Sequence, residues 1–153
     1  MIKNINETLK INMNNLNAYS TGLLQGKAYR ALNTSLTKAL LSYDITIPEW
    51  KLIGQLQDHG TMRLADLAER LNVEAPLVTA LIDALERKNF VKRTNHPNDK
   101  RAKIITITKK GCDLVLAIEP HVKAAMNELL NGVPREKVLI YLEVLQTIVN
   151  NAS

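Results

Sequence analysis

The sequence predicts a mainly α-helical fold with a small β-hairpin, and the spacing of its apolar residues is the main reason. Apolar residues recur every three or four positions over most of the chain, which indicates amphipathic helices. Between residues 90 and 107 the period changes to two, which indicates strands. Two short helical patterns lie directly before these strands. A compact helix pair followed by a hairpin is the element order of a winged helix-turn-helix.

A long helix is predicted near the N-terminus, from an apolar stripe that runs from Leu23 to Leu41. Thr46 and Glu49 then have the spacing of a capping box, in which each side chain satisfies a backbone amide of the other residue. Pro48 is tolerated in the first turn that follows. We therefore expect a second helix that begins at Thr46 and stops next to Gly60.

Two compact helices with a tight joint come next. The first covers residues 64–71, and Asn72 turns the chain. The second covers about residues 75–88, with Pro76 in its first turn, where a missing amide costs little. Asn89 follows where a left-handed cap is needed. The residues predicted to form the buried stripe of this second helix are Leu77, Val78, Leu81, Ile82 and Leu85.

The hairpin is predicted from two short strands, residues 90–94 and 103–107, with a turn that contains Pro97. After the hairpin the helical period returns, and a bend is expected at Pro120. Pro134 opens a last helix. The chain is therefore expected to end in two long helices.

These terminal helices carry more apolar surface than a small central module could cover. A second copy of the chain would bury that surface, and a two-fold dimer is the commonest such arrangement. We expect three parts: a dimerisation helix region over residues 1–45, the winged helix-turn-helix over residues 46–110, and dimerisation helices over residues 111–153.

The positive charge of the chain is concentrated in one segment. Residues 87–110 hold nine cations and one acid, a net charge of +8, whereas the rest of the chain carries −3. A basic segment on a slightly acidic body suits a polyanion such as DNA. On charge alone, a solvated basic surface without a partner fits equally well.

The helix pair and the hairpin together indicate how DNA would be bound. The second helix fits the major groove, with the residues near its start facing base edges and those at its end facing phosphates. Arg101 at the hairpin tip would enter the minor groove, oriented by Asp99. Alternatively, Asp99 and Arg101 form a solvent-exposed ion pair of little energetic value. The candidate DNA-binding residues are Ala75, Pro76, Thr79, Arg87, Lys88, Arg93, Asp99, Lys100, Arg101 and Lys103.

Residues 46–114 resemble the MarR family of bacterial transcriptional regulators. The matching segment is LADLAERLNVEAPLVTALIDALERKNFVKRTNHPNDKRAKIITITKKG. Its most specific part is NDKRA, which begins at Asn98, followed by ITITKKG from Ile105. A lone helix-turn-helix pattern is weakly specific, whereas the helix pair and this hairpin in the right order are strongly specific.

The resemblance implies an obligate homodimer of triangular outline, with interlocked terminal helices and one winged helix per subunit. It implies binding to pseudo-palindromic DNA, usually near the protein's own gene. It also implies that small phenolic or amphipathic ligands bind between the dimerisation and DNA-binding parts and weaken DNA affinity. By residue, the resemblance places DNA contacts at Thr79 and Arg101, with Asp99 positioning the hairpin.

The second helix departs from the family's usual pattern. Pro76 and Leu77 stand where the family usually has a Ser-Thr pair, and Ala80 stands where it has an arginine. The side chains that remain there for hydrogen bonds to bases are Glu74, Thr79 and Asp83. We therefore expect weak base readout, with more of the affinity coming from phosphates and DNA shape.

Other chemistry finds little support in the sequence. The three histidines are scattered, so no metal and no cofactor are predicted. No Gly-rich phosphate loop, Ser-His-acid arrangement or carboxylate pair indicates an enzyme. Cys112 fits either an ordinary thiol or a redox switch. Four aromatic residues fit either a ligand cleft or core and dimer packing: Tyr19, Tyr29, Tyr43 and Trp50.

Three functions remain open on these observations. The first is a ligand-responsive repressor, and the second is an effector-independent or architectural DNA-binding protein. The third is a winged helix used for protein contact, which the +8 segment disfavours. The chain has no apolar stretch long enough for secretion or membrane insertion, so we expect a cytoplasmic protein without a membrane partner.

Overall fold

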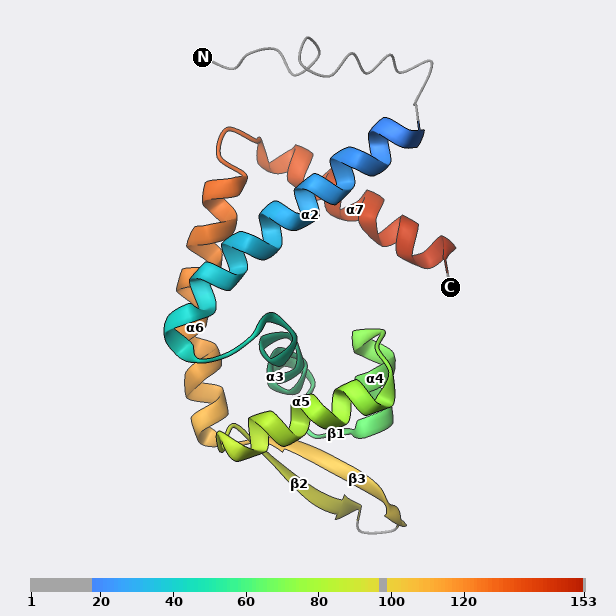
Figure 1. Cartoon of the computed structure of the whole chain (residues 1–153), viewed down its shortest axis with the longest axis vertical. Coiled ribbons are helices and arrows are strands. Elements are labelled where there is room, and N and C mark those ends of the chain that lie inside the picture. The colour runs from blue at the N-terminus through green and yellow to red at the C-terminus, as the bar shows by residue number, and fades with distance from the viewer. Residues whose placement is uncertain (1–17, 97–98, 153) are drawn as a thin grey trace.

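The computed structural model describes residues 18–96 and 99–152, apart from the side chains of residues 18 and 99–101. The elements in chain order are α2 (Ala18–Leu40), the 3-10 helix η1 (Leu41–Tyr43), α3 (Ile47–His59), β1 (Met62–Arg63), α4 (Leu64–Leu71), α5 (Ala75–Arg87), β2 (Val91–His96), β3 (Asp99–Ile107), α6 (Lys109–Leu129) and α7 (Arg135–Asn151). Helices α3, α4 and α5 lie with the strands in one part of the molecule, and α2 and α7 lie in the other (Figure 1). Helix α6 runs along one side and connects the two parts.

The strands form an antiparallel sheet in the order β1-β3-β2, in which Met62 pairs with Ile105 and Val91 with Ile107. The predicted winged helix-turn-helix is therefore confirmed. Strand β1, which sequence analysis missed, ties the start of α4 to the hairpin. The hairpin strands are also longer than predicted, and the predicted turn at Pro97 lies outside the described residues.

The hydrophobic core lies in the winged-helix part and extends to the end of α2 and the middle of α6. Leu52, Ile53 and Leu56 of α3 are fully buried at its centre. The predicted buried stripe of α5 is correct for Val78, Ile82 and Leu85, which are also fully buried. The same prediction is wrong for Leu77, which is 47% exposed, because its position on α5 faces away from the core.

The local signals that set the helix ends behave as expected. The Thr46 hydroxyl accepts a hydrogen bond from the Glu49 amide at 3.3 Å, and the Glu49 carboxylate accepts one from the Thr46 amide at 2.8 Å. Asn72 and Asn89 adopt left-handed backbone conformations, with φ of 51° and 62°. Pro120 lies inside α6, which continues past it to Leu129.

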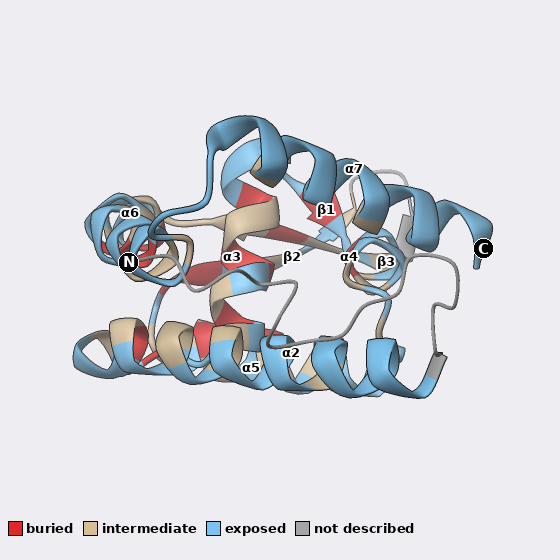
Figure 2. Ribbon diagram, turned by 90° about the horizontal axis from the view of Figure 1, so that it is seen from above, coloured by how far each residue is buried: buried red, intermediate tan, exposed pale blue. Residues whose placement is uncertain are grey.

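Helix α7 leaves its apolar side chains uncovered. No residue of α7 is buried, and most of the helix is exposed (Figure 2). It crosses α2 in Figure 1, yet the view from above separates the two helices. Exposed apolar residues of α7 and α2 include Leu139, Ile140, Leu142, Val144, Ile148, Val149, Leu23, Leu24 and Tyr29. No helix in the described part of the chain is long and apolar enough to span a membrane.

Candidate DNA interface

The side of α5 opposite the core faces solvent. Pro76, Ala80, Asp83 and Arg87 follow one another at intervals of four, three and four residues, so they share one helix face. All four residues are exposed. We call these four residues the outer face of α5. It is the surface that this helix would present to the major groove.

Thr79 and Ala75 lie beside the outer face, near the start of α5. The Thr79 hydroxyl donates a hydrogen bond to the carbonyl oxygen of Ala75 at 3.0 Å. This bond uses the hydroxyl proton, so the side chain offers a ligand its methyl group and an oxygen lone pair. Glu74, which sequence analysis retains for base contact, is the N-cap of α5 and is exposed.

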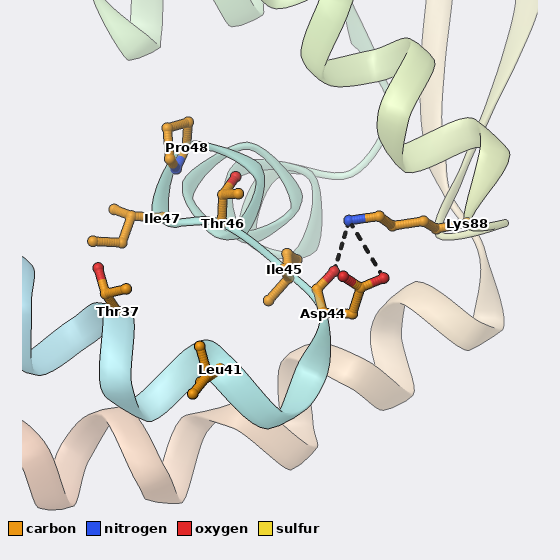
Figure 3. Close-up of a pocket in the computed structure, with 8 residues that line it drawn as sticks. All are labelled: Thr37, Leu41, Asp44, Ile45, Thr46, Ile47, Pro48 and Lys88. Atoms are coloured by element: carbon orange, nitrogen blue, oxygen red, sulfur yellow. Dashed lines mark hydrogen bonds and ion pairs between the residues drawn. The ribbon is translucent and has the colours of Figure 1, made fainter.

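Lys88, predicted to contact a phosphate, instead turns toward the start of α3. Its ammonium donates to the backbone oxygen of Asp44 at 2.6 Å (Figure 3). It also donates to the Glu49 carboxylate at 3.1 Å. Glu49 is 4% exposed, so Lys88 is the counter-charge of a buried carboxylate. This geometry disfavours the phosphate role, because a phosphate would have to compete with both partners.

The environment of Glu49 keeps this carboxylate ionised. Burial raises the pKa of Glu49, but hydrogen bonds from the Thr46 amide and the Lys88 ammonium lower it by more. The net pKa lies below the ordinary value for glutamate. The ion pair between Lys88 and Glu49 therefore joins the end of α5 to the start of α3.

Arg93 on β2, another predicted DNA contact, lies against α5. Its guanidinium pairs with Asp83 and lies 3.6 Å from the Glu86 carboxylate. Glu86 also accepts a hydrogen bond from the Arg93 backbone amide at 3.1 Å. Arg93 thus joins the hairpin to α5 and neutralises Asp83, the acid on the outer face of α5. The expected repulsion between Asp83 and DNA phosphates is reduced accordingly.

Fewer free cations remain in the basic segment than its net charge of +8 implies. Among its described side chains, Lys88, Arg93 and Lys109 pair with carboxylates. The Lys110 ammonium lies 4.8 Å from the centre of the Phe90 ring and donates to the Lys88 carbonyl. The exposed cations in the described part of the segment that have neither a carboxylate partner nor an aromatic contact are Arg87, Lys92 and Lys103.

On the hairpin, Lys103 remains a candidate DNA contact. Its ammonium donates to the Asn95 side chain at 2.5 Å, and it is exposed. Lys92 is an exposed cation that the predicted site omits. Strand alternation could have identified it, because its neighbours Val91 and Arg93 are the residues that pack inward. The side chains of Asp99, Lys100 and Arg101 lie outside the described residues, and their backbone forms the start of β3.

Two surface hollows lie where the winged helix meets α2. One, of about 400 Å³, is lined by Leu41, Ile45, Pro48 and Lys88 among others (Figure 3). The other, of about 340 Å³, contains Tyr29, one of the four aromatic candidates for a ligand cleft. Tyr43 instead donates a hydrogen bond to the Ala117 carbonyl and contacts the ring of His121. Both hollows are mainly apolar.

The structure does not decide whether Cys112 is an ordinary thiol or a redox switch. It also does not test the predicted absence of a metal site. Cys112 is half-buried and unpaired at the start of α6. Within the described ranges, no group of three or more potential metal ligands comes together.

The second helix of the helix-turn-helix is exposed, and a basic hairpin lies beside it. These two features define the winged helix-turn-helix class of DNA-binding proteins. More particularly, residues 45–103 match the model of the MarR family. This match covers the winged helix of the chain and agrees with the resemblance seen in the sequence.

Longer stretches of the chain are similar to known regulators in sequence and to solved structures in fold. The HTH-type transcriptional regulator YfiV of Bacillus subtilis is 27% identical over 97% of this chain and 96% of its own length. A mutant MarR of E. coli in complex with operator DNA superposes with a TM-score of 0.78, at 23% identity over 83% of this chain and 91% of its own. CouR of Rhodococcus jostii bound to p-coumaroyl-CoA gives a TM-score of 0.77, at 22% identity over 84% and 90% of the two chains.

Proposed function

We propose that this chain is a transcriptional repressor that binds pseudo-palindromic DNA as a homodimer and is released by a small amphipathic ligand. The observation that carries the proposal is the exposed outer face of α5 beside a basic hairpin. In this proposal α5 enters the major groove, and Arg87, Lys92 and Lys103 contact phosphates. The contact to the backbone or the minor groove that the sequence predicts for Arg101 involves a side chain outside the described residues.

The uncovered apolar surface of α7 and α2 supports the homodimer. At least seven large apolar side chains of α7 are between 45% and 59% exposed, on a helix with no buried residue. Burial of this surface against a second copy would remove it from water, and a two-fold axis would present two α5 helices to successive turns of the DNA. The described parts of the predicted dimerisation regions, residues 18–45 and 111–152, would then supply the dimer contacts, and residues 1–17 and 153 lie outside the described residues.

The hollow that contains Tyr29 supports a ligand-responsive function. Its wall is formed by residues of α2, α3, α4 and α5, so an occupant would contact both the dimerisation helix and the helix pair. Lys51 adds a cation to a mainly apolar lining, which suits an amphipathic acid. Binding there would release DNA if the ligand favoured a spacing of the two α5 helices that DNA cannot accept.

Binding of the purified chain to DNA flanking its own gene tests the proposal. We expect tighter binding to this duplex than to a scrambled duplex of equal composition, and release by an aromatic acid such as salicylate. Equal binding to both duplexes without release would favour the alternative, an effector-independent or architectural protein. Absence of binding to either duplex at low salt would contradict DNA binding itself.

A further inference from the structure

We propose that α5 recognises the methyl groups of thymine, so that the preferred DNA carries thymines where this helix enters the major groove. The inference rests on the proposed DNA binding and names the base chemistry that the helix takes. It follows from the side chains on the outer face of α5, all of which the structure describes.

The side chains in the N-terminal half of α5 offer the groove no hydrogen-bond donor. Pro76 and Ala80 occupy the first part of the outer face, and both are exposed. Neither side chain can hydrogen-bond, and Ala75 beside them cannot either. What these residues present to a base edge is hydrocarbon.

Thr79 extends this apolar surface rather than adding a donor. Its hydroxyl donates to the Ala75 carbonyl at 3.0 Å, which leaves no proton for guanine or for the O4 atom of thymine. The methyl group of Thr79 remains, next to the Ala80 methyl in the sequence. A cluster of small hydrocarbon groups therefore occupies two turns of the helix.

The major groove offers one matching partner for such a surface. Guanine presents two acceptors, adenine an acceptor and a donor, and cytosine a donor, so each is recognised through hydrogen bonds. Thymine carries a C5 methyl group, which alanine and threonine methyl groups contact favourably. The donor-free half of α5 thus has complementary chemistry for thymine and little for guanine.

The polar half of the outer face does not change this preference. Asp83 could accept a hydrogen bond from cytosine, but its carboxylate is already paired with Arg93. Arg87 lies a full turn beyond Asp83, at the last residue of the helix, where phosphate contact is the expected role. Base selection by α5 is therefore assigned to Pro76, Thr79 and Ala80.

Replacement of thymine by deoxyuridine tests the proposal, because it removes the C5 methyl group and keeps the pairing edge. The probe is a duplex that the full-length protein selects from a randomised 30-bp library. Deoxyuridine is placed at each thymine in turn, and the dissociation constant is measured by fluorescence anisotropy. We expect a loss of about threefold to fivefold at each contacted thymine, the size that burial of one methyl group predicts. Deoxyuridine between the half-sites serves as the control and leaves affinity unchanged.

Two substitutions of Thr79 separate its methyl group from its hydroxyl group. Thr79→Val keeps a methyl group, and we expect it to retain the ratio of thymine to uracil affinities. Thr79→Ser keeps the hydroxyl group, and we expect a smaller ratio. Ala80→Gly also lowers the ratio. Because both duplexes are measured with the same preparation, a loss of stability in any variant does not alter the ratio.

Equal binding of thymine and uracil duplexes, with affinity that still falls with salt, would overturn the thymine proposal and leave the proposed DNA binding intact. Loss of discrimination in Thr79→Val but not in Thr79→Ser would also overturn it, because the hydroxyl group would then carry the contact. If the protein selects no duplex from the library at low salt, the proposed function fails, and the thymine proposal fails with it.

Discussion

At the scale of single residues, the buried carboxylate of Glu49 determines the role of Lys88, the cation at the C-terminal end of α5. Glu49 is 4% exposed, and a lone carboxylate in that position would be costly. The Thr46 amide and the Lys88 ammonium supply its hydrogen bonds. Lys88 therefore stabilises the fold, although its place in a basic segment predicts DNA contact.

Replacement of Lys88 by methionine should destabilise the protein. The change keeps most of the side-chain volume and leaves the Glu49 carboxylate without its cation. A broken buried pair costs about 3–5 kcal/mol, and we expect about 1–3 kcal/mol here because the Lys88 side chain is 28% exposed. Urea unfolding at neutral pH measures the loss. Lys92→Met on the exposed side of β2 is the control and should change stability by less than about 0.5 kcal/mol. Equal stabilities of the two variants would contradict the role of Lys88.

The same contact predicts how stability responds to acid. The folded state holds the pKa of Glu49 below its ordinary value, because the hydrogen bonds from Thr46 and Lys88 outweigh the effect of burial. Its contribution is therefore complete above the ordinary glutamate range and is lost as the pH falls through the lower folded value. Glu49→Gln lacks this contribution, so the stability difference between wild type and variant should shrink as the pH falls from neutral through and below the ordinary glutamate range. A difference that stays constant over this range would contradict the prediction.

At the scale of secondary structure elements, the joint between the hairpin and α6 depends on a close approach at Gly111. A Cβ atom built on Gly111 would lie 2.3 Å from the Phe90 carbonyl oxygen and 2.7 Å from Cγ1 of Ile107. The backbone cannot yield easily there, because Thr108 also bonds the Phe90 carbonyl. The hairpin is therefore held against the helix that leads into the dimerisation part.

A pair of glycine substitutions tests this joint. Gly111→Ala should destabilise the protein by about 2–3 kcal/mol through steric overlap. Gly54→Ala is the matched control, because it lies within α3 and its new Cβ atom would meet nothing within 4 Å. That variant should gain up to about 1 kcal/mol from helix propensity. Thermal unfolding of both variants supplies the comparison, and a Gly111→Ala protein as stable as wild type would contradict the close approach.

The elements differ in how well the sequence predicts them, and local chemistry explains the difference. The start of α3 and the turns at Asn72 and Asn89 depend on neighbouring residues, so their predictions are correct. Strand β1 has two residues, too few to show a period, and it exists because β3 pairs with it. The partners of Lys88 and Arg93 lie on other elements, as far as 44 positions away, which residue spacing cannot predict.

At the scale of the whole molecule, the proposed DNA binding involves two copies of the chain. The winged-helix part has its own core, whereas α7 contributes no buried residue to the chain on its own. An isolated protomer would therefore expose the large apolar side chains of α7 to water.

A charge on α7 tests the proposed dimer. Leu142 is 54% exposed, so Leu142→Asp should leave the winged-helix core intact and place a charge in the interface. We expect sedimentation to give a dimer for wild type and a monomer for the variant at the same concentration. Glu143→Gln on the same helix is the control and should remain dimeric. A dimeric Leu142→Asp protein with a native circular dichroism spectrum would contradict this interface.

The central claim is that the face formed by α5 and the hairpin binds DNA, and the salt dependence of binding tests it most directly. A dimer would present at least six described cations that lack carboxylate partners, namely Arg87, Lys92 and Lys103 from each protomer. Each neutralised phosphate contributes about −0.9 to the slope of log K against log salt concentration. Fluorescence anisotropy on the native flanking duplex should therefore give a slope of about −5 or steeper, with weaker binding to a scrambled duplex. A flat slope, or no binding at low salt, would contradict the claim.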